Sequence, residues 1–101
     1  MTKSTYGQQS FGQTAPTFAN LTDRVLFDEV WQSPGLPPRE RSLATIACLI
    51  ALNRREQLPF HIEKGLENGL TKDTLGELIS HLAFYAGWPC AATAATVLAQ
   101  Y

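Results

Sequence analysis

The sequence predicts an all-α protein, a small bundle of about five helices. Three observations lead to this prediction. Apolar residues recur at spacings of three and four through most of the chain, which is the period of one helix face. No segment alternates apolar and polar residues as a half-buried strand would. Proline, threonine and glycine fall where helices begin and end, and 101 residues with 45% hydrophobic content suit a single domain.

The first residues differ in composition from the rest. Residues 1–14 are rich in Gly, Gln, Ser and Thr, which bury too little surface to offset the entropy lost on ordering. We therefore predict a flexible arm over 1–14 and a helical domain over 15–101. Tyr6 and Phe11 are two places where a neighbouring subunit could pin the arm, and a loose tail without function is the simpler alternative.

The first predicted helix runs from about Pro16 to Phe27 and leaves Asp23 and Arg24 facing solvent. Trp31 is interpreted as an anchor for the connection that follows, which breaks at Ser33-Pro34-Gly35. The apolar face of this helix consists of residues near helical spacing, namely Phe18, Leu21, Val25 and Leu26.

The second predicted helix opens at Leu36-Pro37-Pro38, since proline in a first turn loses no hydrogen bond. It continues to Leu52 and is apolar on nearly every side. Such a helix has to be covered on every side, and a domain of this size has few helices to cover it. The sequence therefore predicts a homo-oligomer in which another subunit supplies the missing cover.

Three further helices are predicted over about 56–68, 71–86 and 89–98. The third helix starts no earlier because Pro59 would then lie beyond the first turn, where proline costs about 3 kcal/mol. Thr71 has the side chain of an N-cap for the fourth helix. The fifth helix consists mostly of small residues, so we expect it to pack closely at a centre or an interface.

Charge and composition exclude several classes of partner. Eight basic and nine acidic residues leave a net charge of -1, so we expect no nucleic-acid partner, which would need a clustered basic excess. No segment resembles a signal peptide or has the ~18 apolar residues that span a bilayer. We therefore expect a cytoplasmic protein without a membrane partner. Cys48 and Cys90 are interpreted as small core residues rather than a redox pair.

The first candidate site lies around His61. Gln57 precedes His61 by four residues and Arg54 precedes it by seven, so the three would share one face of a helix. Arg54 and Arg55 would lie at a helix N-terminus, where basic residues oppose the dipole unless an anion such as a substrate carboxylate is bound. Alternatively, both arginines are solvated and His61 is a hydrogen-bonded core residue. The residues alone leave both interpretations open.

A second candidate lies around His81, four residues after Glu77 and four before Tyr85. Glu77 could pair with the imidazole and raise its pKa towards neutrality. A surface pair without function explains the same spacing. Two histidines without a metal-binding spacing do not make a zinc site, so we expect no metal ion.

The middle and end of the chain read PPRERSLATIACLIALNRREQLPFHIEKGLENGLTKDTLGELISHLAFYAGWP, followed by an alanine-rich helix. They contain an arginine-rich helix opening, a Glu-Gln-Leu-x-x-His turn, an Asn-Gly-Leu-Thr turn and a Tyr-x-Gly-x-Pro junction. In order and spacing these elements resemble the carboxymuconolactone decarboxylase family, over about residues 36–98. The resemblance implies the alkylhydroperoxidase-D-like helical fold, which is commonly assembled as a trimer or a hexamer.

Two branches of this family differ in their chemistry. The disulfide-reductase branch has a Cys-x-x-Cys before the histidine and an acid in the preceding helix. The matching positions here hold Arg54, Gln57 and Ser42, so thiol chemistry of that kind is not expected. The chain is more similar to the decarboxylase branch, which implies loss of carbon dioxide from a carboxylated lactone, giving an enol-lactone without a cofactor.

The resemblance also implies roles for individual residues. His61 would act as general acid, oriented by Glu56 or by an acid of a neighbouring subunit. The substrate would be a small carboxylated ring compound. The residues that would hold it are Arg41, Arg54, Arg55, Gln57, His81, Tyr85 and Trp88. Two alternatives remain: a non-catalytic helical oligomer that binds a small acid, and a peroxidase-like or disulfide-reductase-like protein that uses an isolated cysteine.

Overall fold

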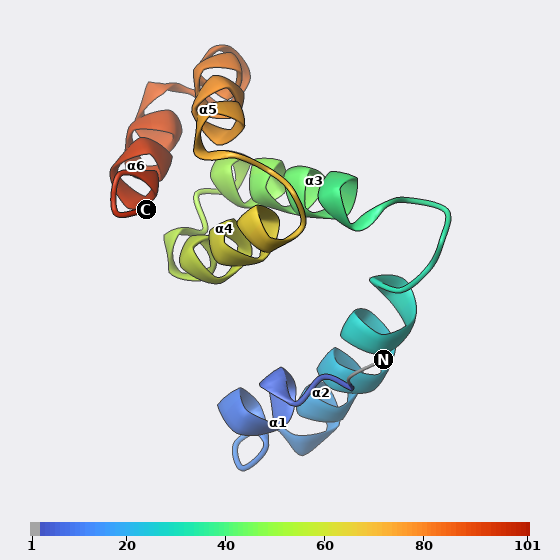
Figure 1. Ribbon diagram of the computed structural model, residues 1–101. Helices are drawn as coiled ribbons and strands as arrows, with labels where there is room; N and C mark the ends of the chain where they lie inside the picture. Colours follow the sequence, from blue (N-terminus) through green and yellow to red (C-terminus); the bar gives the residue numbers. More distant parts are fainter. Residues whose placement is uncertain (1–2) are drawn as a thin grey trace. The chain divides into compact units, whose positions relative to one another are not determined.

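The computed structural model describes residues 3–101 and consists of helices and connections without a strand in that range (Figure 1). The all-α prediction is confirmed, with six α-helices over residues 3–101 rather than about five. Contacts divide the chain into one compact unit that ends at Pro37 and a second unit over Pro38–Tyr101. The division of the chain at residue 14 stays a prediction. No helix within residues 3–101 combines the length and the apolar content needed to cross a bilayer.

The N-terminal unit contains three helical segments: α1 (Tyr6–Phe11), α2 (Pro16–Leu21) and the π-helix η1 (Thr22–Val30). The helix predicted from Pro16 does begin there, but it continues through η1 to Val30 rather than ending at Phe27. A π-helix closes its hydrogen bonds over five residues instead of four. The amide of Trp31 accordingly donates to the carbonyl of Leu26 at 2.9 Å.

Helix α1 falls inside the segment that the sequence predicted as a flexible arm. A carboxylate from η1 holds it: Asp23 accepts hydrogen bonds from the amides of Gly7 at 2.7 Å and Gln8 at 2.9 Å, and from the Ser4 hydroxyl at 2.7 Å. Asp23, which the sequence left to solvent, is thus only partly exposed and forms these hydrogen bonds as well. A side chain 15 residues away satisfies the first amides of α1, and composition alone does not reveal such a contact.

Aromatic rings join α1 to the rest of this unit. The Tyr6 ring lies 6.0 Å from both Phe11 and Phe27, and the Phe11 ring lies 5.0 Å from Phe18. Tyr6 and Phe11 thus pack within their own unit, where the sequence suggested contact with a neighbouring subunit. Trp31 is buried, as an anchor should be, with its ring 6.2 Å from Phe27.

The C-terminal unit is built from two helical hairpins. Its segments are α3 (Pro38–Ala51), the 3-10 helix η2 (Arg55–Gln57), α4 (Leu58–Glu67), α5 (Lys72–Ala86) and α6 (Trp88–Leu98). Helices α3 and α4 form one hairpin and α5 and α6 the other, and α3 contacts both α5 and α6. Within this unit Figure 1 shows the turn between α5 and α6 at the end of the hairpin that lies away from α4.

The core of the C-terminal unit comes from its own helices and from Leu70 in the connection between α4 and α5. Helix α3 buries Ile46 and Ile50 against it, whereas Leu52 and Cys48 are exposed. The interpretation of Cys48 as a core residue is therefore wrong, and part of the apolar surface of α3 is left uncovered by the other helices of this unit. The buried residues of the core are Ile46, Ile50, Leu58, Ile62, Leu70, Leu75, Ile79, Ala83, Ala91, Ala94, Val97 and Leu98.

Local signals correctly placed the ends of these helices. Pro59 lies in the first turn of α4, after the short turn of η2. The Thr71 hydroxyl accepts a hydrogen bond from the amide of Thr74 at 3.0 Å and so caps α5. Gly69 and Gly87 follow the ends of α4 and α5 with φ of 102° and 101°, a conformation that glycine adopts without a steric penalty.

Candidate functional site

The candidate site around His61 begins in the connection between α3 and α4. Asn53 has a φ of 57°, which reverses the chain, and Arg54 follows with φ -92° and ψ 69°. Arg54 is therefore not helical, and Gln57 belongs to η2 rather than to α4. The prediction that Arg54, Gln57 and His61 share one helix face is wrong for Arg54. The chain instead brings all three to the same end of α4.

The four residues before α4 are polar and exposed: Arg54, Arg55, Glu56 and Gln57. Leu58, which follows them, is almost completely buried and fixes the start of α4 against the core. The first amides of a helix lack intrahelical partners and carry the positive end of its dipole. Arg54 and Arg55 precede these amides in the sequence, with the acidic Glu56 between Arg55 and α4. Guanidinium groups and free helix amides are groups that bind carboxylates.

His61 lies in the first half of α4 and is half-buried. Its Nδ1 atom is shielded from solvent, and its ring lies edge-on to the Phe60 ring at 4.9 Å. Burial lowers the pKa of His61 below 6.5, and the nearby Lys64 ammonium lowers it further. The neutral imidazole therefore predominates at neutral pH when no anion is bound.

The C-terminal residue Tyr101 contacts α4, which the sequence did not predict. The Tyr101 hydroxyl donates to Glu63 Oε2 at 3.2 Å and lies 3.4 Å from the Pro59 carbonyl oxygen. Burial raises the pKa of Tyr101, and the hydrogen bond and charge of Glu63 raise it further. The two partners lie on either side of His61 in the sequence, so the segment after α6 packs along the half of α4 that carries the histidine. No local pattern links residues 38 positions apart.

Arg41 is placed away from the other two arginines. The Asn68 side-chain amide donates to Ser42 Oγ at 2.9 Å, so the start of α3 lies beside the end of α4. Arg54 follows the opposite end of α3. A rise of 1.5 Å per residue puts about 15 Å between the helix positions of Arg41 and Ala51. One chain therefore does not bring Arg41 to the start of α4.

A second cluster lies where α5 meets α6. The His81 ring is 4.9 Å from Tyr85, and the Phe84 ring is 5.5 Å from Trp88. Phe84, Tyr85 and Trp88 are 80%, 78% and 65% exposed. Trp88 begins α6, about 15 Å along that helix from Leu98 at its other end, and the chain beyond Leu98 contacts α4 (Figure 1). His81, Tyr85 and Trp88 therefore lie away from His61 within one chain.

The sequence missed Phe84 as a member of this aromatic cluster, although its spacing of four from Trp88 was a usable signal. His81 packs beside Tyr85, and in the described part of the chain no ion pair joins it to Glu77. Cys48 and Cys90 are both free thiols, the second half-buried. Within residues 3–101 no three His, Cys, Asp or Glu side chains gather as metal ligands would.

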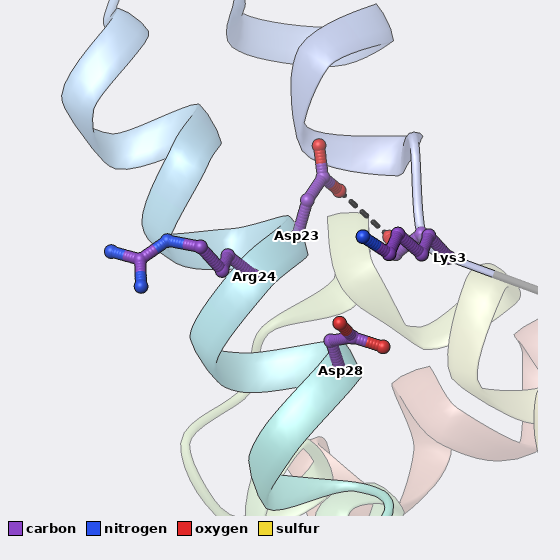
Figure 2. Close-up of a pocket in the computed structure, with 5 residues that line it drawn as sticks. Lys3, Asp23, Arg24 and Asp28 are labelled. Atoms are coloured by element: carbon purple, nitrogen blue, oxygen red, sulfur yellow. Dashed lines mark hydrogen bonds between the residues drawn. The ribbon is translucent and has the colours of Figure 1, made fainter.

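The N-terminal unit contains a polar hollow of about 170 Å³ (Figure 2). Its lining residues are Lys3, Ser4, Asp23, Arg24 and Asp28. Figure 2 shows the carboxylate of Asp23 turned towards the segment of Lys3, where it accepts the hydrogen bond from Ser4. Because Asp23 also holds the amides of α1, this hollow is best explained as part of the structure of that unit. None of the predicted site residues lines it.

Comparison with known proteins identifies the family to which the chain is similar. The model of the carboxymuconolactone decarboxylase family matches residues 16–100. Over 83 residues the chain is 48% identical to a 4-carboxymuconolactone decarboxylase of Acinetobacter baylyi, which covers 82% of the chain and 61% of that protein. Over 60 residues it is 37% identical to a nitrosuccinic acid decarboxylase of Metarhizium robertsii, covering 59% of the chain and 42% of that protein.

The chain thus matches less than two thirds of the length of either curated relative. The family match itself extends over most of the chain and includes α4 with the polar residues that precede it. This chain belongs to the carboxymuconolactone decarboxylase family.

Proposed function

We propose that the chain is a cofactor-free decarboxylase of a small carboxylated ring compound such as carboxymuconolactone, with His61 as the proton donor. The observation that carries the proposal is the arrangement at the start of α4. Two exposed guanidinium groups, the first amides of the helix and a half-buried imidazole occur within eight residues. Both curated relatives are named as decarboxylases, of different acids, which supports the reaction class more strongly than any one substrate.

Binding of the substrate uses the positive end of α4. Arg54 and Arg55 bind a carboxylate of the substrate through charge-assisted hydrogen bonds, and Gln57 adds a neutral donor. The dipole of α4 favours negative charge at the same place. These groups hold the ring beside His61 and reduce the hydration of the carboxylate that leaves.

Loss of carbon dioxide needs one bond broken and one proton delivered. The bond between the ring carbon and the departing carboxyl carbon breaks, and its electron pair remains on the substrate as a dienolate. Carbon dioxide leaves. The imidazolium of His61 then gives its proton to the carbanionic carbon, and the neutral ring regains a proton from solvent before the next cycle.

The lowered pKa of His61 is compatible with these reaction steps only if the bound substrate changes it. Burial and Lys64 keep the imidazole neutral in the free protein. An anion within about 4–6 Å favours the charged form of a base, so a bound carboxylate raises the pKa of His61 and loads it with the proton that it will deliver. Glu56, exposed one turn earlier, is proposed to orient the charged ring.

Four of the predicted site residues lie far from His61 within one chain, and we propose that another copy of the chain supplies them. His81, Tyr85 and Trp88 lie at the far end of the α5–α6 hairpin, and Arg41 at the far end of α3, so they join His61 only from another copy. The exposed aromatic side chains and the uncovered surface of α3 support a homo-oligomer, for which we propose a trimer or a hexamer.

The test is turnover of carboxymuconolactone by the purified chain, followed by its ultraviolet absorbance. His61→Gln should reduce kcat by about 100-fold to 10,000-fold, the range for loss of a general acid. Arg39→Gln, which removes a cation paired with Glu40 near the start of α3, should leave kcat unchanged. Undiminished turnover by a folded His61→Gln variant, or a larger loss in His81→Gln, would remove His61 from the proposed role.

A further inference from the structure

The residues that follow α6 are bonded to the buried end of that helix. The amide of Tyr101 donates to the carbonyl of Leu98 at 3.0 Å, and the amide of Gln100 donates to the carbonyl of Val97 at 3.2 Å. Leu98 and Val97 both belong to the core of the C-terminal unit. The core therefore sets the position of Tyr101, and Figure 1 shows the end of α6 beside the start of α4.

The Tyr101 hydroxyl contacts the turn of α4 that contains His61. It donates to Glu63 Oε2 at 3.2 Å and lies 3.4 Å from the Pro59 carbonyl oxygen. Pro59 and Glu63 are four residues apart, so they share one face of α4. His61 is midway between them, and two residues correspond to about 200° around a helix. Tyr101 thus contacts the side of this turn opposite to the imidazole.

The start of α4 depends on tertiary contacts more than the start of α5 does. Thr71 caps α5 with its side chain. In the described chain the N-cap residue of α4, Gln57, makes no such bond, and Pro59 in the first turn has no amide hydrogen. Helix ends fray, and a missing cap makes fraying easier. Besides the buried Leu58, the contact with Tyr101 is therefore what keeps this turn in place.

We propose that Tyr101 is a positioning residue of the candidate site: its hydroxyl holds the first turn of α4, so that His61 stays in place to protonate the substrate carbon. This inference rests on the proposed function, since it takes His61 as the proton donor. A misplacement of about 1 Å can reduce a rate by about 100-fold. Loss of the hydroxyl should therefore slow the chemical step, whereas Arg54 and Arg55 act on binding.

The first experiment measures kcat and KM with carboxymuconolactone. Tyr101→Phe removes the hydroxyl and keeps the ring, so kcat should fall by about tenfold and KM should change by less than about twofold. Glu63→Ala should cause the same fall, and the double variant should be no worse than either single one, because the two groups act as a unit. Glu63→Gln keeps an oxygen that accepts the hydrogen bond, so it should retain most of kcat.

The second experiment needs no substrate. Burial lowers the pKa of His61, so a loosened turn that admits water should raise this pKa towards 6.5 in Tyr101→Phe. Lys64, whose charge also lowers the pKa of His61, is present in both proteins. NMR titration of the His61 ring resonances in wild type and in Tyr101→Phe measures the difference.

Thr71→Ala is the control for a general loss of stability. It removes the cap of α5 and should lower the urea midpoint, but it should leave kcat and the pKa of His61 unchanged. Equal effects of Thr71→Ala and Tyr101→Phe would overturn the proposal, as would a Tyr101→Phe variant in which kcat or the pKa of His61 stays at the wild-type value.

A failure of the proposed function gives a different result. Full turnover by a folded His61→Gln variant would remove His61 from the reaction, and with it the role of Tyr101 in catalysis. A raised pKa of His61 in Tyr101→Phe would then show that the contact orders α4 without serving the reaction. Loss of kcat in His61→Gln but not in Tyr101→Phe would overturn the role of Tyr101 alone.

Discussion

The Asn68 side-chain amide donates a hydrogen bond of 2.9 Å to Ser42 Oγ, and Ser42 is fully buried. This bond joins the residue that ends α4 to the first turns of α3 across 26 positions of sequence. It sets how the two helices of the hairpin align, and so where α4 presents His61. We expect the alignment to depend on it because a buried hydroxyl that loses its partner is costly.

Asn68→Ala should therefore lower the free energy of unfolding by about 1–3 kcal/mol, measured by urea denaturation. Asn20→Ala, which truncates an exposed amide in α2, is the matched control and should change it by less than about 0.5 kcal/mol. Equal stability of both variants would show that the Asn68–Ser42 bond does not support the hairpin.

Gly65 and Gly76 should respond in opposite directions to the same substitution. A Cβ at Gly65 would lie 3.0 Å from both Ile46 Cδ1 and Leu70 Cδ1, so Gly65→Ala should destabilise by about 1–3 kcal/mol through overpacking. Gly76 lies within α5 with no atom within 4 Å of the added Cβ, so Gly76→Ala should stabilise by up to about 1 kcal/mol. Thermal unfolding of the two variants measures whether stability falls in the first and rises in the second.

The lowered pKa of His61 predicts a loss of stability in weak acid. The unfolded chain binds a proton near pH 6.5 and the folded protein only at lower pH, so the unfolded state holds more protons between these values. Stability therefore falls as the pH drops through about 6.5 and the loss is complete below the folded pKa. The hydrogen-bonded carboxylate of Asp23 also has a lowered pKa because the bonds from Ser4, Gly7 and Gln8 outweigh its desolvation. Its contribution is lost only at pH values below about 3.8.

Urea denaturation at pH 7.5 and pH 5.5 separates these windows. Wild type should lose stability between the two pH values, and His61→Gln should lose less. The same slope in both proteins would mean that His61 is not desolvated in solution.

Binding of an anion at the start of α4 should reverse the lowering of the His61 pKa. A non-reactive dicarboxylate analogue of the substrate adds negative charge beside the imidazole, so the pKa of His61 should rise towards or above 6.5. NMR titration of the ring resonances with and without the analogue measures this change. A pKa that stays constant at saturating analogue would place the ligand elsewhere.

Arg54 and Arg55 should act on substrate binding. Arg54→Gln and Arg55→Gln should each raise KM by about tenfold, with a smaller effect on kcat, because the carboxylate they hold is present before and during the reaction. Arg39→Gln serves as the control, since Arg39 is engaged with Glu40 near the start of α3. If the Arg39 variant raises KM as much as the other two, the arginine effect is general electrostatics and not local binding.

The sequence by itself determined the helical class and most helix ends in the C-terminal unit. Pro59, Thr71 and Gly87 act on the backbone within about four residues, so their effects can be read without knowing the fold. The prediction of a site at His61 and its polar neighbours rests on their spacing and on the family resemblance. The structure keeps these residues near one another because the chain before α4 is short.

Only the tertiary structure decided which ends of the helices meet. Asp23 holds α1, Tyr101 packs along α4, and Asn68 ties α4 to α3 through contacts across 15 to 38 positions of sequence. The separation of Tyr85 from His61 follows from that packing, as does the exposure of Cys48. Such contacts depend on where distant segments come to lie, and periodicity along one helix contains no information about its neighbour.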